Sequence, residues 1–348
     1  MLQKKDISVL SLALLLSLIT AAKPQTVFLA FDPAFAQSPS ASPFKVPDVV
    51  PKDAKVRVNG SSSLTKINQI LKQRFEEKFS GTTVELPKGY SGSTQALQAV
   101  LDGQLELAAL GRPLTDAEKA KGLEQVVIAR HKIAMIVGAN NPFQGSLTDK
   151  QFAQIFRGEI TDWSQVGGKP GKIRLIDRPE ASDTRQAFQS YPVFKQAPFK
   201  PGANTVTVTE DTTEAVIEAL GTDGISYAIA DQVFQIPDSP AKVLQMHKTL
   251  PNNPAYPFSQ PLVYVYKPAA TLPPALQAFL AYATAPENQA AIESARKAEA
   301  TSPAPIAQVP TTPSPSATAT SPVPPISDAS ILAKSPDGAL TVTGGKDG

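Results

Sequence analysis

The stretch that decides the fold is residues 55–110, KVRVNGSSSLTKINQILKQRFEEKFSGTTVELPKGYSGSTQALQAVLDGQLELAAL. Three short strands are predicted here, at Val56–Val58, at Thr83–Leu86 and at Leu105–Leu110. Between them, apolar residues recur at helical spacing and predict two helices, one ending near Phe79 and one over Thr94–Leu101. This alternation of strands and helices predicts a parallel sheet covered by helices.

A cluster of Ser, Thr and Gly residues follows a predicted strand and opens a predicted helix three times in the chain. The clusters are Asn59–Ser63, Tyr90–Thr94 and Ala181–Thr184. The first N–H groups of a helix lack partners within it, and the helix dipole places partial positive charge there. One such cluster is typical of an ordinary helix cap. Three of them predict several helix starts directed at one small oxyanion.

Composition limits the classes of function. The 348 residues suffice for two domains, and 42% hydrophobic with 18% charged residues is typical of a globular chain. A net charge of +2 gives no sign of the clustered basic charge that nucleic-acid binding requires. The absence of cysteine excludes disulfides, thiolate metal sites, a cysteine nucleophile and an N-terminal lipid anchor on cysteine.

Catalytic and metal-binding patterns are also missing from the sequence. The two histidines, His131 and His247, are far apart and belong to no ligand or nucleophile motif. No pair of carboxylates has a context that suggests general acid–base catalysis. We therefore predict a protein that is not an enzyme and holds neither metal nor cofactor.

The N-terminal residues 1–36 are predicted to be a secretory signal. Its parts are the basic residues Lys4 and Lys5, the apolar segment Val9–Ala22 and the cleavage site Ala34–Ala36 before Gln37. The apolar segment is shorter than the roughly 20 residues that span a bilayer. A retained anchor is the alternative, because the second apolar run Val27–Ala30 lengthens the segment. The favoured prediction is a soluble, exported, periplasmic protein.

Residues 37–53, rich in Ser, Pro and Ala, are predicted to be a flexible lead-in. Farther on, the long apolar run Val126–Val137 could pass from one domain to another. A helix that begins with a capping box between Thr148 and Gln151 and a strand over Leu262–Tyr266 are also predicted. Residues 299–326 form a Pro/Ser/Thr-rich linker that cannot build a packed core. Residues 327–348 resemble part of a WD40 propeller blade. This tail is either the start of a longer architecture or disordered, and we favour disorder because one partial blade has nothing to pack against.

With the clusters placed, residues of about 55–298 resemble the phosphate-binding proteins of ABC-type uptake systems, a type II periplasmic binding fold. The segments that carry the resemblance occur in order: Gly60–Leu64, Tyr90–Ser93, Gly111–Leu114, Leu147–Gly158, Ile160–Gly168, Arg178–Arg185 and Asp223–Tyr227. The resemblance implies a two-lobed α/β fold in which each lobe has a mixed, mainly parallel sheet flanked by helices. A ligand cleft lies between lobe 1 (residues 54–130 and 258–298) and lobe 2 (residues 131–257).

The resemblance also implies a function and a set of ligands. A monomeric solute-binding protein would close over phosphate or a similar tetrahedral oxyanion and deliver it to the permease of an ABC transporter. The implied first-lobe donors are Ser62, Ser63, the Leu64 amide, Ser91 and Ser93, and the implied second-lobe ligands are Arg178, Ser182, Asp183 and Thr184. Arg112, Arg185 and Gly111 are further candidates near the cleft, with Arg185 preferred over Arg112.

Two positions depart from the family's pattern. Gly111 stands where phosphate binders of the best-known kind carry an acidic residue that accepts the proton of hydrogen phosphate. Asp183 replaces the glycine of the usual Ser-Gly-Thr motif. Asp183 would serve as the missing proton acceptor, or it would cap the helix facing away, or anion affinity would be reduced or lost. The alternative function is therefore a non-transport sensor or adaptor on the same fold.

Overall fold

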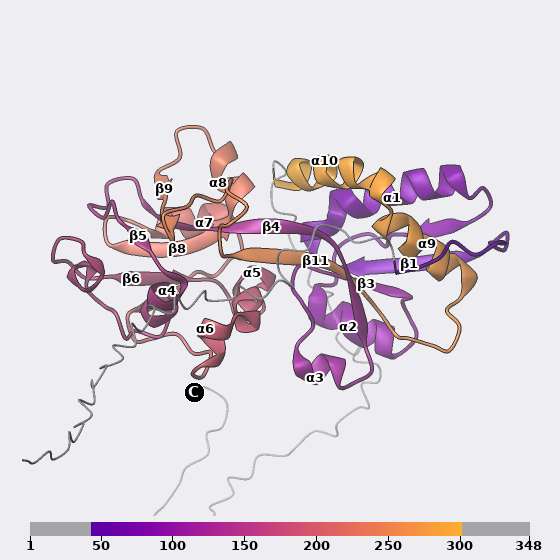
Figure 1. The fold of residues 1–348 in the computed structure, drawn as a ribbon, viewed down its shortest axis with the longest axis horizontal. Helices are drawn as coiled ribbons and strands as arrows, with labels where there is room; N and C mark the ends of the chain where they lie inside the picture. The colour runs from indigo at the N-terminus through magenta and orange to yellow at the C-terminus, as the bar shows by residue number, and fades with distance from the viewer. Residues whose placement is uncertain (1–42, 301–348) are drawn as a thin grey trace, which may run out of the picture. The chain divides into compact units, whose positions relative to one another are not determined.

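Two long antiparallel strands, β4 (Glu124–Gly138) and β11 (Ser259–Tyr266), run side by side through the middle of the sheet in the computed structural model (Figure 1). The structure describes residues 43–300. The first part of β4 pairs with β11, and its last part, from Ile133, pairs with β8 (Gly224–Ile229). The apolar run predicted from the sequence is therefore one strand that belongs to both halves of the sheet.

Within the described residues the main sheet has nine strands, in the order β2-β1-β3-β11-β4-β8-β6-β7, with β9 also paired to β4. The remaining strands of this sheet are β1 (Lys55–Gly60), β2 (Thr83–Glu85), β3 (Leu107–Leu110), β6 (Arg174–Asp177), β7 (Thr205–Thr207) and β9 (Ala241–Val243). A separate parallel pair joins β5 (Ser146–Leu147) to β10 (Gln245–Met246).

The predicted β-α-β-α-β unit is confirmed. Strand β1 pairs in parallel with both β2 and β3, with Val56 opposite Val84 and Val58 opposite Leu107. Parallel strands need crossover connections, which the intervening helices supply. The sheet as a whole is mixed, because β11 is antiparallel to β3 and β4, and β4 is antiparallel to β8.

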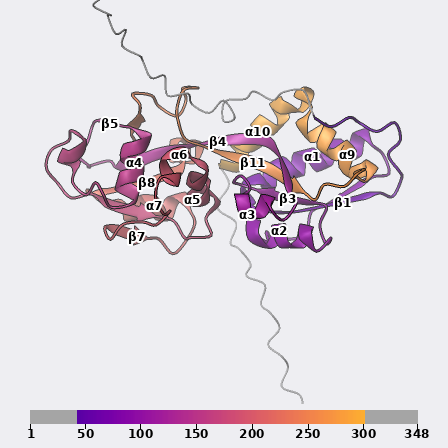
Figure 2. The ribbon, with the colours of Figure 1, turned by 60° about the horizontal axis from the view of Figure 1, so that its bottom comes forward.

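Helices cover both faces of the sheet (Figures 1 and 2). The α-helices are α1 (Thr65–Lys78), α2 (Ser93–Leu101), α3 (Asp116–Lys119), α4 (Asp149–Phe156), α5 (Asp183–Ala187), α6 (Pro192–Lys195), α7 (Thr213–Ala219), α8 (Ala230–Gln235), α9 (Pro274–Thr284) and α10 (Gln289–Ala300). Short 3-10 turns are η2 (Ser62–Leu64), η3 (Trp163–Val166), η4 (Phe188–Ser190) and η5 (Pro286–Asn288). The start of α4 has the predicted capping box between Thr148 and Gln151.

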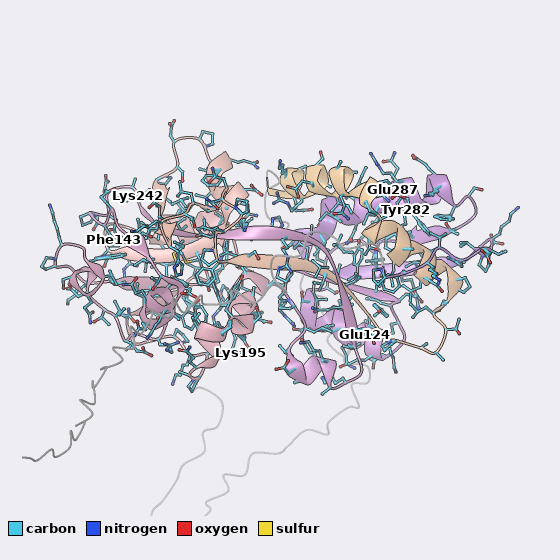
Figure 3. All side chains as sticks on the ribbon, viewed as in Figure 1. Glu124, Phe143, Lys195, Lys242, Tyr282 and Glu287 are labelled. Atoms are coloured by element: carbon cyan, nitrogen blue, oxygen red, sulfur yellow. The ribbon has the colours of Figure 1, made fainter. Side chains whose placement is uncertain are left out.

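The apolar core separates into clusters that share no residues. In the half with β1 and β3, α1, α9 and α10 pack on one face and α2 on the other. In the half with β6 and β8, α4, α5 and α6 pack on one face and α7 and α8 on the other. The core of this half also includes Phe143, labelled in Figure 3, which stacks on Trp163 with ring centroids 4.5 Å apart. We call these halves the first and second lobes; the residue boundaries inferred from the sequence stay a prediction.

Several predictions concern the ends of the chain. The signal 1–36 and the tail 327–348 lie outside the described residues, as does the predicted linker 299–326 except for residues 299 and 300, which are the last two of α10. Of the predicted lead-in, residues 43–53 contain neither helix nor strand, and Phe44 packs edge-on against Tyr266 at 5.8 Å. Within residues 43–300, no helix has the length and apolar character needed to cross a membrane.

Candidate anion-binding site

The first two clusters lie together at the carboxyl ends of β1 and β3. The amide of Ser61 donates to the carbonyl of Ala109 at 2.7 Å, and the amide of Gly92 donates to the carbonyl of Gly60 at 3.1 Å. Gly60 has a φ of +148°, and a Cβ there would lie 2.0 Å from the Ala109 oxygen. Glycine is therefore required for the first cluster to approach β3 this closely.

The third cluster meets the other two through Asp183, the first residue of α5. The hydroxyl of Ser93 donates to Asp183 Oδ2 at 2.8 Å, and the amide of Gly111 donates to the same oxygen at 3.1 Å. Ser182 precedes Asp183 as the N-cap, and its hydroxyl accepts from the amide of Arg185 at 3.4 Å. The structure therefore brings one carboxylate of the second lobe onto donors of the first lobe.

Arg112 and Gln260 complete the surroundings of this carboxylate. The terminal nitrogens of Arg112 both donate to Glu118 at 2.8 Å, while its Nε lies 3.7 Å from Asp183 Oδ1. Gln260, on β11, accepts from the hydroxyl of Thr184 at 2.8 Å through Oε1. Arg112 Nε, Gln260 Nε2 and Asp183 Oδ1 are buried and have no hydrogen-bond partner among residues 43–300. Buried polar groups without a hydrogen-bond partner are rare in native proteins.

The electrostatics of Asp183 follow from its position. Burial raises the pKa of Asp183, because a charged carboxylate is disfavoured away from water. Hydrogen bonds from Ser61, Ser93 and the Gly111 amide, together with the positive charge of Arg112, act in the opposite direction on this pKa. The net effect is a carboxyl group that takes up a proton more readily than an exposed aspartate.

Asp183 occupies the space that a side chain at residue 111 would need. A Cβ at residue 111 would lie 2.9 Å from Asp183 Oδ2 and 2.7 Å from Gln260 Nε2. No side chain fits at residue 111 while Asp183 and Gln260 hold these positions. The space beside Gly111 is thus occupied by a carboxylate from the other lobe; whether this carboxylate takes the role of the family's acidic residue stays a prediction.

The other predicted first-lobe donors bond mainly to their own neighbours. The amide of Ser63 donates to Ser61 Oγ, and the amide of Leu64 donates to the carbonyl of Ser61, each at 3.3 Å. The carbonyl of Ser62 accepts from Thr65 Oγ1 at 2.7 Å, and the hydroxyl of Ser91 donates to the carbonyl of Gly92 at 3.3 Å.

The two predicted second-lobe arginines bond within their own lobe. Arg178 forms an ion pair with Asp211 at 2.8 Å and donates to Thr213 Oγ1 at 3.2 Å. Arg185 forms a buried ion pair with Asp177 at 2.8 Å, and its guanidinium packs against aromatic rings. The arginine that forms an ion pair with Asp183 is Arg112, the one that the sequence favoured less.

Sequence reasoning named no role for the side chain of Ser61 or for Gln260. Ser61 lay inside the first cluster, but the neighbouring serines were preferred by resemblance. Gln260 lies in the fully buried strand β11, whose predicted start at Leu262 was three residues late. A glutamine and a proline at residues 260 and 261 interrupt the apolar pattern there, and a buried polar side chain in a central strand was the available signal.

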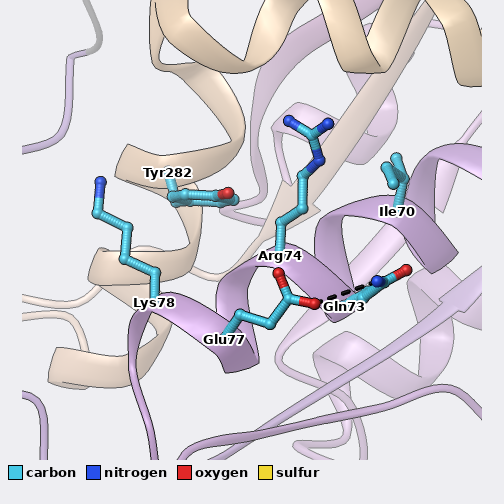
Figure 4. Close-up of a pocket in the computed structure, with 6 residues that line it drawn as sticks. All are labelled: Ile70, Gln73, Arg74, Glu77, Lys78 and Tyr282. Atoms are coloured by element: carbon cyan, nitrogen blue, oxygen red, sulfur yellow. Dashed lines mark hydrogen bonds between the residues drawn. The ribbon is translucent and has the colours of Figure 1, made fainter.

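The rest of the described structure offers no competing chemical centre. Among residues 43–300, no group of three or more His, Asp or Glu side chains could hold a metal ion. A pocket of about 570 Å³ lies on α1 beside Tyr282, where Gln73 donates to Glu77 at 3.1 Å (Figure 4). None of its lining residues belongs to the three clusters. The convergence on Asp183 is therefore the candidate site.

The fold and the convergence of helix starts between two lobes are typical of a solute-binding protein. The family model described as the PBP superfamily domain matches residues 46–287, and the chain belongs to this superfamily. The resemblance inferred from the ordered segments and the two-lobed α/β fold class are confirmed at this level. The family consists of binding proteins rather than enzymes.

Individual relatives carry more specific names. The chain is 27% identical over 187 residues to the phosphate-binding protein PstS of Bacillus subtilis, a match that spans 51% of this chain and 59% of that protein. It is 24% identical over 226 residues to PstS of Staphylococcus saprophyticus, with 62% and 70% covered. The chain thus spans about three fifths of the first relative's length.

Solved structures agree on the fold. A putative phosphate ABC transporter substrate-binding protein with bound phosphate, from Clostridium perfringens, aligns with a TM-score of 0.53 and 24% identity, covering 70% of this chain and 98% of that one. PstS from Borrelia burgdorferi aligns with a TM-score of 0.54 and 20% identity, covering 70% and 97%.

Proposed function

We propose that this chain is a solute-binding protein that captures phosphate or a similar tetrahedral oxyanion between its two lobes. The observation that carries the proposal is the convergence of Ser93 and the Gly111 amide, from the first lobe, on one anionic oxygen of the second lobe. Fixed amides and hydroxyls can replace the water shell of an anion with little reorganisation. The names of the relatives support phosphate as the anion.

The proposed ligand set keeps the hydrogen-bond donors that the resemblance implied. Ser93, Ser182 and Thr184 lie at or beside the convergence, while Arg178 would contribute its charge only after exchanging Asp211 for the anion. The amides of Ser63 and Leu64 and the hydroxyl of Ser91 would have to give up their present bonds in the same way, whereas the bond of Ser62 is accepted by its carbonyl and leaves its hydroxyl as the donor.

The transport role is also part of the proposal. After export and removal of residues 1–36, the protein would act as a monomer in the periplasm and deliver its anion to the permease of an ABC transporter. The alignment with a putative phosphate ABC transporter substrate-binding protein supports this assignment. Intact mass of exported protein tests the export step: we expect a chain that begins near Gln37, and a mass that includes residues 1–36 would contradict it.

A sensor or adaptor without a transport role is the second candidate. The observation that favours it is that Asp183 already holds donors that an anion would use. Native mass spectrometry of protein purified without added phosphate distinguishes the candidates. A co-purifying anion of phosphate mass, displaced by excess arsenate, supports capture of oxyanions. Protein that stays free of anions after incubation with phosphate argues for the second candidate.

A further inference from the structure

The Asp183 carboxylate has the chemistry of a bound anion. It crosses from the second lobe to the first and accepts two hydrogen bonds on Oδ2, from a hydroxyl and from a main-chain amide. Its side chain is only 12% exposed, and Arg112, the nearest cation, is 4% exposed. Neutral donors plus one buried cation around an anionic oxygen are what a small oxyanion requires.

The carboxylate reaches only some of the donors around it, because both of its hydrogen bonds are made by Oδ2 and Oδ1 accepts none among residues 43–300. Arg112 Nε lies 3.7 Å from Asp183 Oδ1, beyond hydrogen-bond distance, and Gln260 Nε2 donates to no group among residues 43–300. Gln260 is fully buried, and its amide nitrogen lies close to the space beside Gly111. A tetrahedral oxyanion presents four oxygens in different directions, so it can accept from the two donors that Asp183 Oδ1 does not reach.

We propose that Asp183 is an internal ligand of the oxyanion site, which a free oxyanion displaces, and that Arg112 Nε and Gln260 Nε2 belong to the donors that receive it. This inference rests on the proposed function and adds to it the residue that competes with the solute. Binding becomes an exchange in which the carboxylate leaves Ser93 and Gly111 and the oxyanion takes its place. Because the two donors and the acceptor lie on different lobes, the exchange requires the lobes to separate at this contact.

The exchange sets the affinity of the site. A carboxylate that stays near the site repels a dianion, and one that leaves must give up its bonds to Ser93 and Gly111. The repulsion and the loss of these hydrogen bonds both weaken the binding of a free anion in the parent protein. Replacing Asp183 by asparagine keeps an acceptor of similar shape but removes the charge. The repulsion of the anion and the cost of breaking the hydrogen bonds to Ser93 and Gly111 then both become smaller.

The test is calorimetric titration with sulfate at neutral pH, using the full chain. Sulfate carries no proton there, so the protonation of the ligand does not change during the experiment. The variants are Asp183→Asn and Asp183→Ser, and the matched control is Asp149→Asn. Asp149 also follows an N-cap threonine as the first residue of a helix, but it bonds to His247 and lies outside the three clusters.

We expect both Asp183 variants to bind sulfate at least about tenfold more tightly than the parent, because a competing like charge has been removed. The control should match the parent, and Asp183→Asn/Gln260→Leu should bind more weakly than Asp183→Asn. Thermal unfolding checks that each variant is folded. If the parent binds phosphate and the Asp183 variants bind sulfate no better than the parent, the internal ligand is refuted and the proposed function stands. If neither parent nor variants bind either anion, both proposals fail.

Discussion

Arg185 gives the sharpest test of whether the arginine that follows the third cluster supports the fold or binds the solute. Its Nε donates to Asp177 Oδ2 at 2.8 Å, and the guanidinium carbon lies 5.0 Å from the ring centre of Phe199. The two side chains of the ion pair are 8% and 1% exposed. Arg185→Leu would leave the charge of Asp177 buried and unpaired, so we expect a loss of about 3–5 kcal/mol in the free energy of unfolding.

Urea unfolding of three variants measures this loss. Arg185→Leu/Asp177→Asn should recover part of it, because no unpaired charge then remains in the core. Lys55→Leu is the control: it breaks an ion pair whose lysine is 62% exposed, and should change the free energy of unfolding far less than Arg185→Leu. A loss below about 1 kcal/mol for Arg185→Leu, combined with weaker phosphate binding, would refute this reasoning and assign Arg185 to the anion site.

Three further predictions concern charge. Because burial raises the pKa of Asp183, its carboxylate becomes protonated at a higher pH than usual. Sulfate titrations of the parent should therefore show tighter binding as the pH falls from about 7 to about 5. A sulfate affinity that does not change with pH would contradict this. Burial and the charge of Arg296 lower the pKa of His131 to about 4, below its unfolded value of 6.5. The folded state therefore binds fewer protons, and up to about 3 kcal/mol of stability should be lost as the pH falls from about 6.5 through about 4. In thermal unfolding measured at a series of pH values, His131→Gln should remove this loss of stability. An unchanged pH dependence in the variant would contradict the prediction. Arg178→Ala should weaken phosphate binding by about 2–5 kcal/mol in calorimetry if Arg178 reaches the anion, whereas unchanged affinity would limit its role to the ion pair with Asp211.

The fold was largely predictable because its main determinants are local in sequence. Alternation at Val56 and Val58, followed by helical spacing of Ile67, Leu71 and Phe75, defines β1 and α1 without knowledge of any distant contact. The capping box at Thr148 fixed the start of α4 to the residue. Later elements such as β11 began elsewhere than predicted, because burial between two neighbouring strands hides the periodic pattern.

The candidate site was less predictable because its contacts are long-range. Ser93 and Asp183 are 90 positions apart, and Gly111 and Asp183 are 72 apart. The sequence identified all three as candidates, but it could not tell which way Asp183 faces or that Arg112 would lie beside it. Those features depend on how α5 is placed against the end of β3, and periodicity carries no information about that distance.

The central claim is that the three clusters form one site for an oxyanion, and calorimetric titration of the purified protein with inorganic phosphate tests it most directly. The account predicts saturable binding with one phosphate per chain, and weaker binding in Ser93→Ala, which removes a donor at the convergence. Absence of any heat with phosphate, in the parent and in Asp183→Asn alike, would contradict the claim.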